Sequence, residues 1–193
     1  MSMADLARSE FLMGGQRSGK SRRAEMLAVQ WLQAVPGRRA VMLATAQAWD
    51  DEMRDRIARH RADRRERVPG MHTVEEPLAL AEALQRHSAA DTLVVVDCLT
   101  LWLSNLMMPM RAEDALDEAG VIEAEQALCR SLVAATGPVV VVGNEIGLGV
   151  IPMGRDVRAF VDALGRLNQR VAATCERVTL MVAGLPMVLK GAV

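Results

Sequence analysis

The 193-residue sequence contains no tyrosine, and it has only two phenylalanines and three tryptophans. Proteins that bind single-stranded nucleic acids stack the bases on such rings, so this class of function is not expected. The net charge is −1, with 23 basic and 24 acidic residues, and the basic excess that a polyanionic partner attracts is missing. We therefore expect no nucleic acid among its partners.

Cysteine is scarce as well, and the three cysteines form neither a CxxC pair nor a metal-binding pattern with histidine. Isolated thiols are typical of proteins in a reducing compartment. No apolar run approaches the length of a membrane span, and the first ten residues lack the apolar core of a signal peptide. We expect a cytoplasmic protein without stable membrane insertion.

What the sequence does contain is a complete phosphate-binding loop, GGQRSGKS, over residues 14–21 (the phosphate loop). Its glycines allow backbone N–H groups to turn toward phosphate oxygens, where a Cβ would obstruct the turn. Lys20 would place its charge on the β- and γ-phosphates, and the Ser21 hydroxyl would bind Mg²⁺. The nucleotide-binding residues predicted from this motif are Gly14, Gly15, Gln16, Arg17, Ser18, Gly19, Lys20 and Ser21.

The segments around the phosphate loop have the periodicity that the motif requires. A short apolar run over 10–13 precedes it, and a stripe at helical spacing follows it. Further apolar runs alternate with amphipathic segments, which predicts strands buried on both faces and helices between them. The fold class is therefore α/β: a P-loop NTPase fold with a mostly parallel sheet, helices on both faces and a single domain. The predicted domain spans 1–193, with 1–8 as a loosely ordered lead-in, and the further strands are expected at 40–44, 93–97, 139–142 and 178–182.

Three other features are candidates for chemistry, and each also has a purely structural interpretation. Asp97 ends a buried strand, as the second acidic residue of P-loop NTPases does, and would bind Mg²⁺; otherwise it caps the next helix. His60 ends the less charged face of a helix expected over 50–64, where simple packing is more common than catalysis. The glycine-rich stretch 143–149 would contact a ligand or form a flexible turn. The polar, basic segment 61–70 predicts a surface loop.

Together these motifs resemble the bifunctional adenosylcobinamide kinase / adenosylcobinamide-phosphate guanylyltransferase family of cobalamin synthesis. The helix sequence DDEMRDRIARHR and the loop sequence NEIGLGVIP are more specific for it than the phosphate loop alone. The matching stretches follow the family order and cover nearly the whole chain: 14–25, 44–61, 73–77, 94–106, 142–152 and 165–172.

The resemblance implies two reactions at one nucleotide site. ATP or GTP phosphorylates the aminopropanol hydroxyl of adenosylcobinamide, and GTP then transfers GMP to that phosphate, giving adenosylcobinamide-GDP and pyrophosphate. It implies a guanylylated histidine that falls on His60, next to Arg59, and hence His60 and Lys20 as catalytic residues. It also implies a homotrimer, Mg²⁺ at Ser21 and Asp97, and nucleotide contacts from Thr45, Ala46, Gln47, Arg61, Arg64, Asp97 and either Glu75 or Glu76.

Two consequences follow for the site. Since one phosphate loop would serve attack at the γ- and then at the α-phosphate, we expect the nucleotide or the His60 helix to move between steps, with this helix as a mobile lid. Two other functions fit the phosphate loop: a small-molecule kinase without guanylyl transfer, which needs no nucleophilic histidine, and a non-catalytic GTP-binding regulator.

Overall fold

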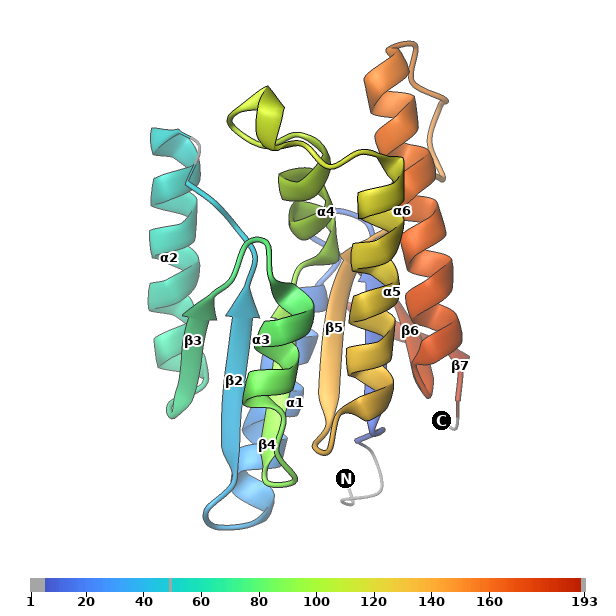
Figure 1. Cartoon of the computed structure of the whole chain (residues 1–193). Helices are drawn as coiled ribbons and strands as arrows, with labels where there is room; N and C mark the ends of the chain where they lie inside the picture. The colour runs from blue at the N-terminus through green and yellow to red at the C-terminus, as the bar shows by residue number, and fades with distance from the viewer. Residues whose placement is uncertain (1–5, 49, 192–193) are drawn as a thin grey trace.

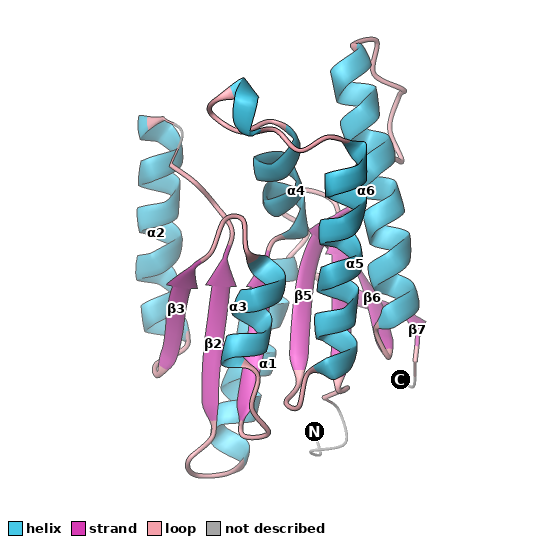
Figure 2. Cartoon of the chain, viewed as in Figure 1, coloured by secondary structure: helices cyan, strands magenta, loops and turns pink. Residues whose placement is uncertain are grey.

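The computed structural model of the chain describes residues 6–48 and 50–191, and only the backbone of Arg56. Seven strands form one sheet, shown as arrows in Figure 1 and in magenta in Figure 2. They are β1 (Ser9–Gly14), β2 (Arg39–Ala44), β3 (Met71–Glu75), β4 (Thr92–Asp97), β5 (Val139–Asn144), β6 (Arg177–Val182) and β7 (Leu185–Lys190). Their order in the sheet is β3-β2-β4-β5-β1-β6-β7, and all pairs are parallel except β6 with β7.

Helices cover both faces of this sheet (Figure 1). One apolar core cluster joins α1, and Val68 directly after α2, to the sheet, through residues such as Leu27 and Met42. The cluster on the other face joins α3, α4, α5 and α6, through residues such as Trp102 and Leu128. The bounds are α1 (Lys20–Ala34), α2 (Asp51–Arg67), α3 (Leu80–His87), α4 (Leu99–Met107), α5 (Glu118–Ala134) and α6 (Arg155–Thr174), with a short 3₁₀ helix η2 (Ala112–Asp114).

This architecture confirms the predicted P-loop α/β fold. The strands predicted as continuous apolar runs are central, and the valines of β4 and β5 are buried because helices cover both faces. Within the described residues, no helix is both long and apolar enough to cross a membrane.

Two strands were not predicted, and both lie at the edges of the sheet. β3 and β7 are largely half-buried or exposed, so neither has the continuous apolar run of a central strand. In β7, Pro186 also lacks the N–H that a second partner strand would require. Edge strands are determined by their neighbour in the sheet more than by their own sequence.

The prediction of a surface loop over 61–70 was wrong for most of its length, because α2 continues to Arg67. The polar sequence does not indicate that this segment packs against the protein. It does so because the Arg64 side chain is buried and donates to Thr73 Oγ1 at 3.3 Å. The predicted lead-in over 1–8 falls mostly on residues 1–5, which lie outside the described residues. At its end, the Arg8 guanidinium donates to the carbonyl oxygens of Val133 and Ala135.

The parallel strands end at one edge of the sheet, and the predicted site residues follow those ends. The phosphate loop follows β1, Asp97 ends β4 and Asn144 ends β5. Figure 1 shows three segments that extend beyond this carboxyl edge: the first half of α2, the connection with η2, and the first turns of α6 with the loop before it. Open α/β sheets bind ligands at this edge.

Candidate functional site

The phosphate loop turns tightly between β1 and α1, and two of its glycines are required by the backbone. Gly14 has φ +149°, and a Cβ there would lie 2.4 Å from the Met181 carbonyl oxygen. Gly19 has φ +101° and lies against Gly184, whose N–H donates to the Ser18 carbonyl at 3.0 Å. The turn between β6 and β7 therefore supports the phosphate loop from behind.

Lys20, the first residue of α1, is buried beneath this loop. Its Nζ donates to the carbonyl oxygens of Gly14 at 3.0 Å and Gly15 at 2.7 Å. Burial lowers the pKa of Lys20, while the neighbouring Cys98 and Asp97 raise it. The ammonium group lies directly below the exposed tip of the loop, formed by residues 15–17. It is in position to exchange a carbonyl oxygen for a phosphate oxygen.

Asp97 and Ser21 are the two residues that the sequence predicts as ligands of a metal ion at this site. Asp97 is half-buried at the end of β4, close enough to Lys20 to raise its pKa. The described residues include no cluster of three His, Cys, Asp or Glu side chains that could hold a metal alone. One carboxylate and one hydroxyl fit Mg²⁺, which takes only one or two protein ligands when phosphate oxygens and water complete its shell.

Thr45 has a structural role inside the protein. Its hydroxyl donates to the Cys98 carbonyl at 2.7 Å and accepts from the Cys98 N–H at 2.8 Å. The Asn105 amide donates to the Thr45 carbonyl at 2.8 Å and to the Pro77 carbonyl at 3.1 Å. Because Thr45 is fully buried, it fixes the ends of β2 and β4, and the residues after it are the ones that a ligand can reach.

Those residues line a cavity of about 390 Å³ between α2 and the ends of β2 and β3 (the α2 cavity). It brings together four of the predicted nucleotide-binding residues, two of which, Arg61 and Glu75, form an ion pair across it. Its volume is within the range of small-molecule sites. The lining residues are Ala46, Gln47, Ala48, Arg54, Ile57, Ala58, Arg61, Glu75 and Pro77.

The structure also distinguishes the two neighbouring glutamates. The Glu76 carboxylate accepts from the N–H groups of Leu78 at 3.2 Å and Ala79 at 2.8 Å, just before α3. It is used at the start of that helix. Glu75 instead lines the α2 cavity, so of the two it is the one available to a ligand there.

His60 lies on α2 beside the α2 cavity, but not among its lining residues. The lining positions 54, 57, 58 and 61 share one face of the helix, and at 100° per residue His60 lies on the flank of that face. Its side chain is exposed, and no other described residue donates to it or accepts from it. The imidazole is therefore accessible to a ligand on this side of α2.

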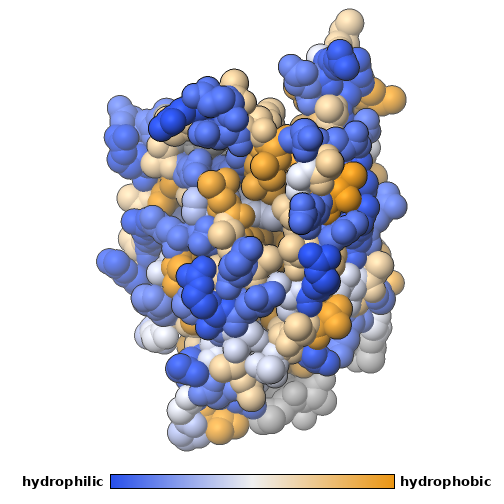
Figure 3. Space-filling model, in the orientation of Figure 1, coloured by the Kyte–Doolittle hydropathy of each residue, from blue (hydrophilic) through white to orange (hydrophobic). Residues whose placement is uncertain are grey.

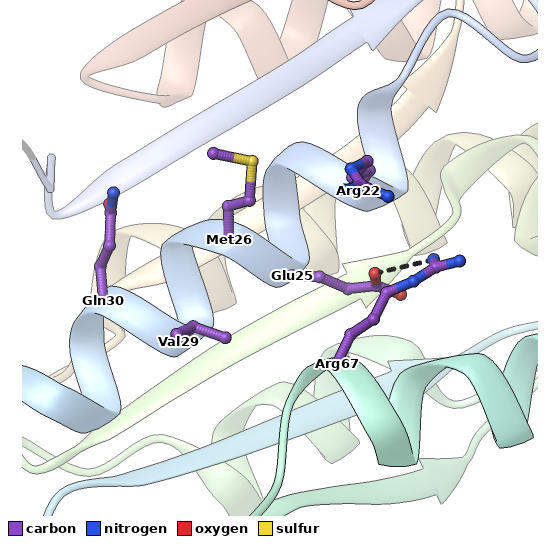
Figure 4. A pocket seen from close by; sticks show the side chains of 6 residues that line it. All are labelled: Arg22, Glu25, Met26, Val29, Gln30 and Arg67. Atoms are coloured by element: carbon purple, nitrogen blue, oxygen red, sulfur yellow. Dashed lines mark hydrogen bonds and ion pairs between the residues drawn. The ribbon is translucent and has the colours of Figure 1, made fainter.

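Polar contacts hold α2 in place. The Asp50 carboxylate caps its first turn by accepting from the Met53 N–H at 2.7 Å. At its last turn, Arg67 lies 3.3 Å from Glu25 of α1, and Figure 4 shows the two side chains pointing toward each other. They border a second hollow of about 320 Å³ on the outer side of α1, which contains none of the predicted site residues. Its lining residues are Arg22, Glu25, Met26, Val29, Gln30 and Arg67.

The structure does not bring His60 to the phosphate loop. Two strands separate β2 from β1, so at about 4.8 Å per strand the loops after them are roughly 14 Å apart. A nucleotide that contacts both would have to be extended, or α2 would have to move.

The sequence analysis missed Arg54, Ala58 and Asn105. The i, i+3, i+4, i+7 spacing of 54, 57, 58 and 61 would have indicated the cavity face.

The comparisons with known proteins agree with one another. The model of the cobinamide kinase / cobinamide phosphate guanyltransferase family matches residues 10–189. The bifunctional adenosylcobalamin biosynthesis protein CobP of Pseudomonas aeruginosa is 46% identical over 183 residues, covering 94% of this chain and 97% of the relative. The CobU protein of Escherichia coli, described in the same words, is 36% identical over 184 residues, covering 92% of this chain and 97% of the relative.

Two solved structures share the fold at low sequence identity. The flagellar accessory protein FlaH of Methanocaldococcus jannaschii has a TM-score of 0.52 at 9% identity, covering 96% of this chain and 80% of that one. A structurally characterised protein of Pyrococcus horikoshii has a TM-score of 0.55 at 8% identity, covering 97% of this chain and 89% of that one. They support the fold assignment alone.

Proposed function

This chain belongs to the cobinamide kinase / cobinamide phosphate guanyltransferase family, and from that premise we propose that it catalyses two successive transfers on adenosylcobinamide. As a member of this family of bifunctional cobalamin-biosynthesis enzymes, it is a nucleotide-using transferase. In the first transfer, the aminopropanol hydroxyl attacks the γ-phosphorus of ATP or GTP, loses its proton, and releases the nucleoside diphosphate. In the second, GMP passes from GTP to the new phosphate.

The phosphate loop serves the first transfer. Lys20 would neutralise charge on the β- and γ-phosphates, and the backbone N–H groups at the start of α1 would bind the same oxygens. Bound Mg²⁺ would neutralise further charge on these phosphates, with Ser21 and Asp97 as its protein ligands. These groups are preorganised, because Gly14 packs closely against the Met181 backbone and the Gly184 N–H donates to the Ser18 carbonyl.

His60 serves the second transfer. Its imidazole nitrogen attacks the α-phosphorus of GTP, a P–N bond forms, the bond to the bridging oxygen breaks and pyrophosphate leaves. The phosphate of adenosylcobinamide-phosphate then attacks the same phosphorus, releases the imidazole and gives adenosylcobinamide-GDP. The free, exposed ring beside the α2 cavity is the observation that carries this assignment.

The α2 cavity is the proposed site of the guanosine. Ala46 and Gln47 would form one wall, and Glu75 would accept hydrogen bonds from the guanosine once its ion pair with Arg61 opens. Arg61 would then be released toward phosphate oxygens. Arg64, which is turned inward to Thr73, would hold α2 in place in this conformation rather than contact the ligand.

Mass spectrometry of the protein after incubation with GTP and Mg²⁺ tests the proposal. We expect one added GMP unit per chain, mapped by fragmentation to the peptide that contains His60 and lost in acid. A second incubation with adenosylcobinamide-phosphate should remove the label and yield adenosylcobinamide-GDP. A protein that binds GTP and phosphorylates cobinamide, but never carries the label, would instead be a plain kinase. The homotrimer implied by the resemblance remains a prediction.

A further inference from the structure

The loop between β5 and α6, residues 145–154 (the apolar loop), exposes an unusual series of side chains. Leu148 is 86% exposed, Val150 95%, Ile151 78% and Met153 96%. Single exposed apolar residues are ordinary, but four within six positions give this loop a largely apolar exposed surface. Such a surface in a folded protein indicates a binding site for an apolar partner.

The apolar loop is held at both ends. At its start, the Glu145 N–H donates to the Gly14 carbonyl at 3.1 Å, and the Asn168 amide donates to the Asn144 carbonyl at 3.0 Å. At its end, the Arg158 guanidinium donates to the Pro152 carbonyl at 3.0 Å and also to the Met153 carbonyl. The backbone is thus anchored by specific bonds, while the side chains between the anchors point into solvent.

The first anchor places this surface directly beside the phosphate loop. β5 is the neighbour of β1, with Asn144 opposite Gly14, so the apolar loop begins where the phosphate loop begins. From there it extends beyond the carboxyl edge of the sheet together with the first turns of α6 (Figure 1). In Figure 3, the projecting segment at the upper right is mostly blue, with a small hydrophobic patch at its tip and outer side.

The α2 cavity has the contrary character. β4 separates it from β5, where the apolar loop begins, and its lining includes Arg54, Arg61 and Glu75. A nucleotide is polar and charged, whereas the corrin of cobinamide is a broad macrocycle whose rim carries methyl groups as well as amide side chains. The charged side chains of the α2 cavity therefore favour the nucleotide there, and the exposed apolar side chains favour the methyl-bearing corrin at the apolar loop.

We propose that the apolar loop binds the corrin macrocycle of the acceptor and so brings the aminopropanol hydroxyl to the γ-phosphate at the phosphate loop. This inference rests on the proposed function, since it assigns the second substrate of the same site. Leu148, Val150, Ile151 and Met153 supply the contact surface, and burying them against the macrocycle provides the binding energy. The hydroxyl-bearing arm then extends from the ring along the short path from Glu145 to Gly14.

The test uses Val150→Ser and Met153→Ser, singly and together, in the full-length protein. Both side chains are almost fully exposed, so the substitutions leave the core unchanged. Binding of cobinamide, without nucleotide, is measured by equilibrium titration, and the KM for cobinamide and for GTP by steady-state kinetics. We expect the double variant to bind cobinamide at least tenfold more weakly and its KM for cobinamide to rise as much, while the KM for GTP changes less than twofold.

Val133→Ser is the matched control, because it removes an exposed valine at the end of α5, away from the apolar loop. The Val133 carbonyl oxygen accepts from Arg8, which precedes β1, so this position lies at the other end of the strand from the phosphate loop. We expect its cobinamide affinity to equal that of the wild type. Titration needs no turnover, so the two proposals can fail separately: a wild type that binds cobinamide through the apolar loop but transfers nothing contradicts only the proposed function. Unchanged cobinamide binding in the double variant overturns the inference. If the double variant also sediments as a smaller species, a second copy of the chain covers the loop instead.

Discussion

Helices α1 and α2 lie on the same side of the sheet, but different forces hold them there. α1 buries Ala24, Leu27 and Ala28 in the apolar core and begins with the buried Lys20. In α2, Arg64 is the only buried side chain among those described, and contacts such as Arg64 with Thr73 and Arg67 with Glu25 hold the helix. Buried apolar surface stabilises by about 25 cal/mol per Å², whereas partly exposed ion pairs contribute about 1 kcal/mol or less.

This difference corresponds to the two proposed chemical roles. In the proposed first transfer the phosphate loop and Lys20 are fixed, because preorganised donors stabilise a transition state without rearranging. In the proposed second transfer His60 reaches the α-phosphorus of the nucleotide, so the helix that carries it should open locally at low free-energy cost. The proposed mobile lid is therefore consistent with how weakly α2 is packed. The predictions that follow test this contrast, from the largest expected effect to the smallest.

Lys20→Ala tests the fixed region. We expect both activities to fall by at least about 10³-fold, because both transfers need the triphosphate held and its charge neutralised at the same loop. Steady-state rates of cobinamide phosphorylation and of GMP transfer measure the effect, and circular dichroism checks that the fold is kept. Loss of only one activity would mean that the two reactions use different phosphate sites.

His60→Ala tests the weakly held region. We expect GMP transfer to fall by about 10³-fold or more while cobinamide phosphorylation stays within about threefold, because the histidine is needed only as the nucleophile of the second step. Transfer of α-labelled GMP and of γ-labelled phosphate to cobinamide is measured side by side. His72→Ala, which removes another exposed histidine, is the control and should retain both activities. Equal loss of both in His60→Ala would contradict the separate roles.

The phosphate loop and α2 also differ in how much of their structure could be predicted from the sequence. The whole phosphate loop is one continuous motif, so its residues and its strand-to-helix setting could be predicted, as could the central strands with their unbroken apolar runs. Helix α2 has so little apolar periodicity that its last turns resembled a loop. The contact that orders those turns, Arg64 with Thr73, joins separate elements and leaves no local pattern.

The α2 cavity shows the same limit. Gln47, Arg61 and Glu75 come from three separate elements, and only the family resemblance connected them before the fold was known. The sequence also could not distinguish Glu75 from Glu76, because the difference lies in which carboxylate accepts from the Leu78 and Ala79 N–H groups. Thr45, a polar residue predicted to contact the nucleotide, is fully buried with its hydroxyl bonded to the Cys98 carbonyl, a contact that its sequence does not indicate.

Asp97→Asn tests the metal side of the fixed region. We expect the Mg²⁺ concentration for half-maximal phosphorylation to rise about tenfold, because the amide loses the charge that binds the ion. Asp97 also raises the pKa of Lys20, so its removal should lower that pKa further. Since Lys20 acts as a cation, the alkaline limb of the pH–rate profile should move to lower pH. An unchanged Mg²⁺ requirement would mean that Asp97 does not bind the ion.

Glu25→Gln tests the contact between the two helices and has the smallest expected effect. It weakens the ion pair with Arg67, which is partly exposed and worth about 0.5–1 kcal/mol, so α2 amides should exchange about two- to fivefold faster. Amides of α1 should not change, because buried apolar residues hold that helix. Asp91→Asn is the control: it breaks the exposed pair with Arg39 at the start of β2 and should leave α2 unaffected. Faster exchange in α1 as well would mean that the two helices open as one unit. The contrast between a firmly packed α1 and a weakly packed α2 would then not hold.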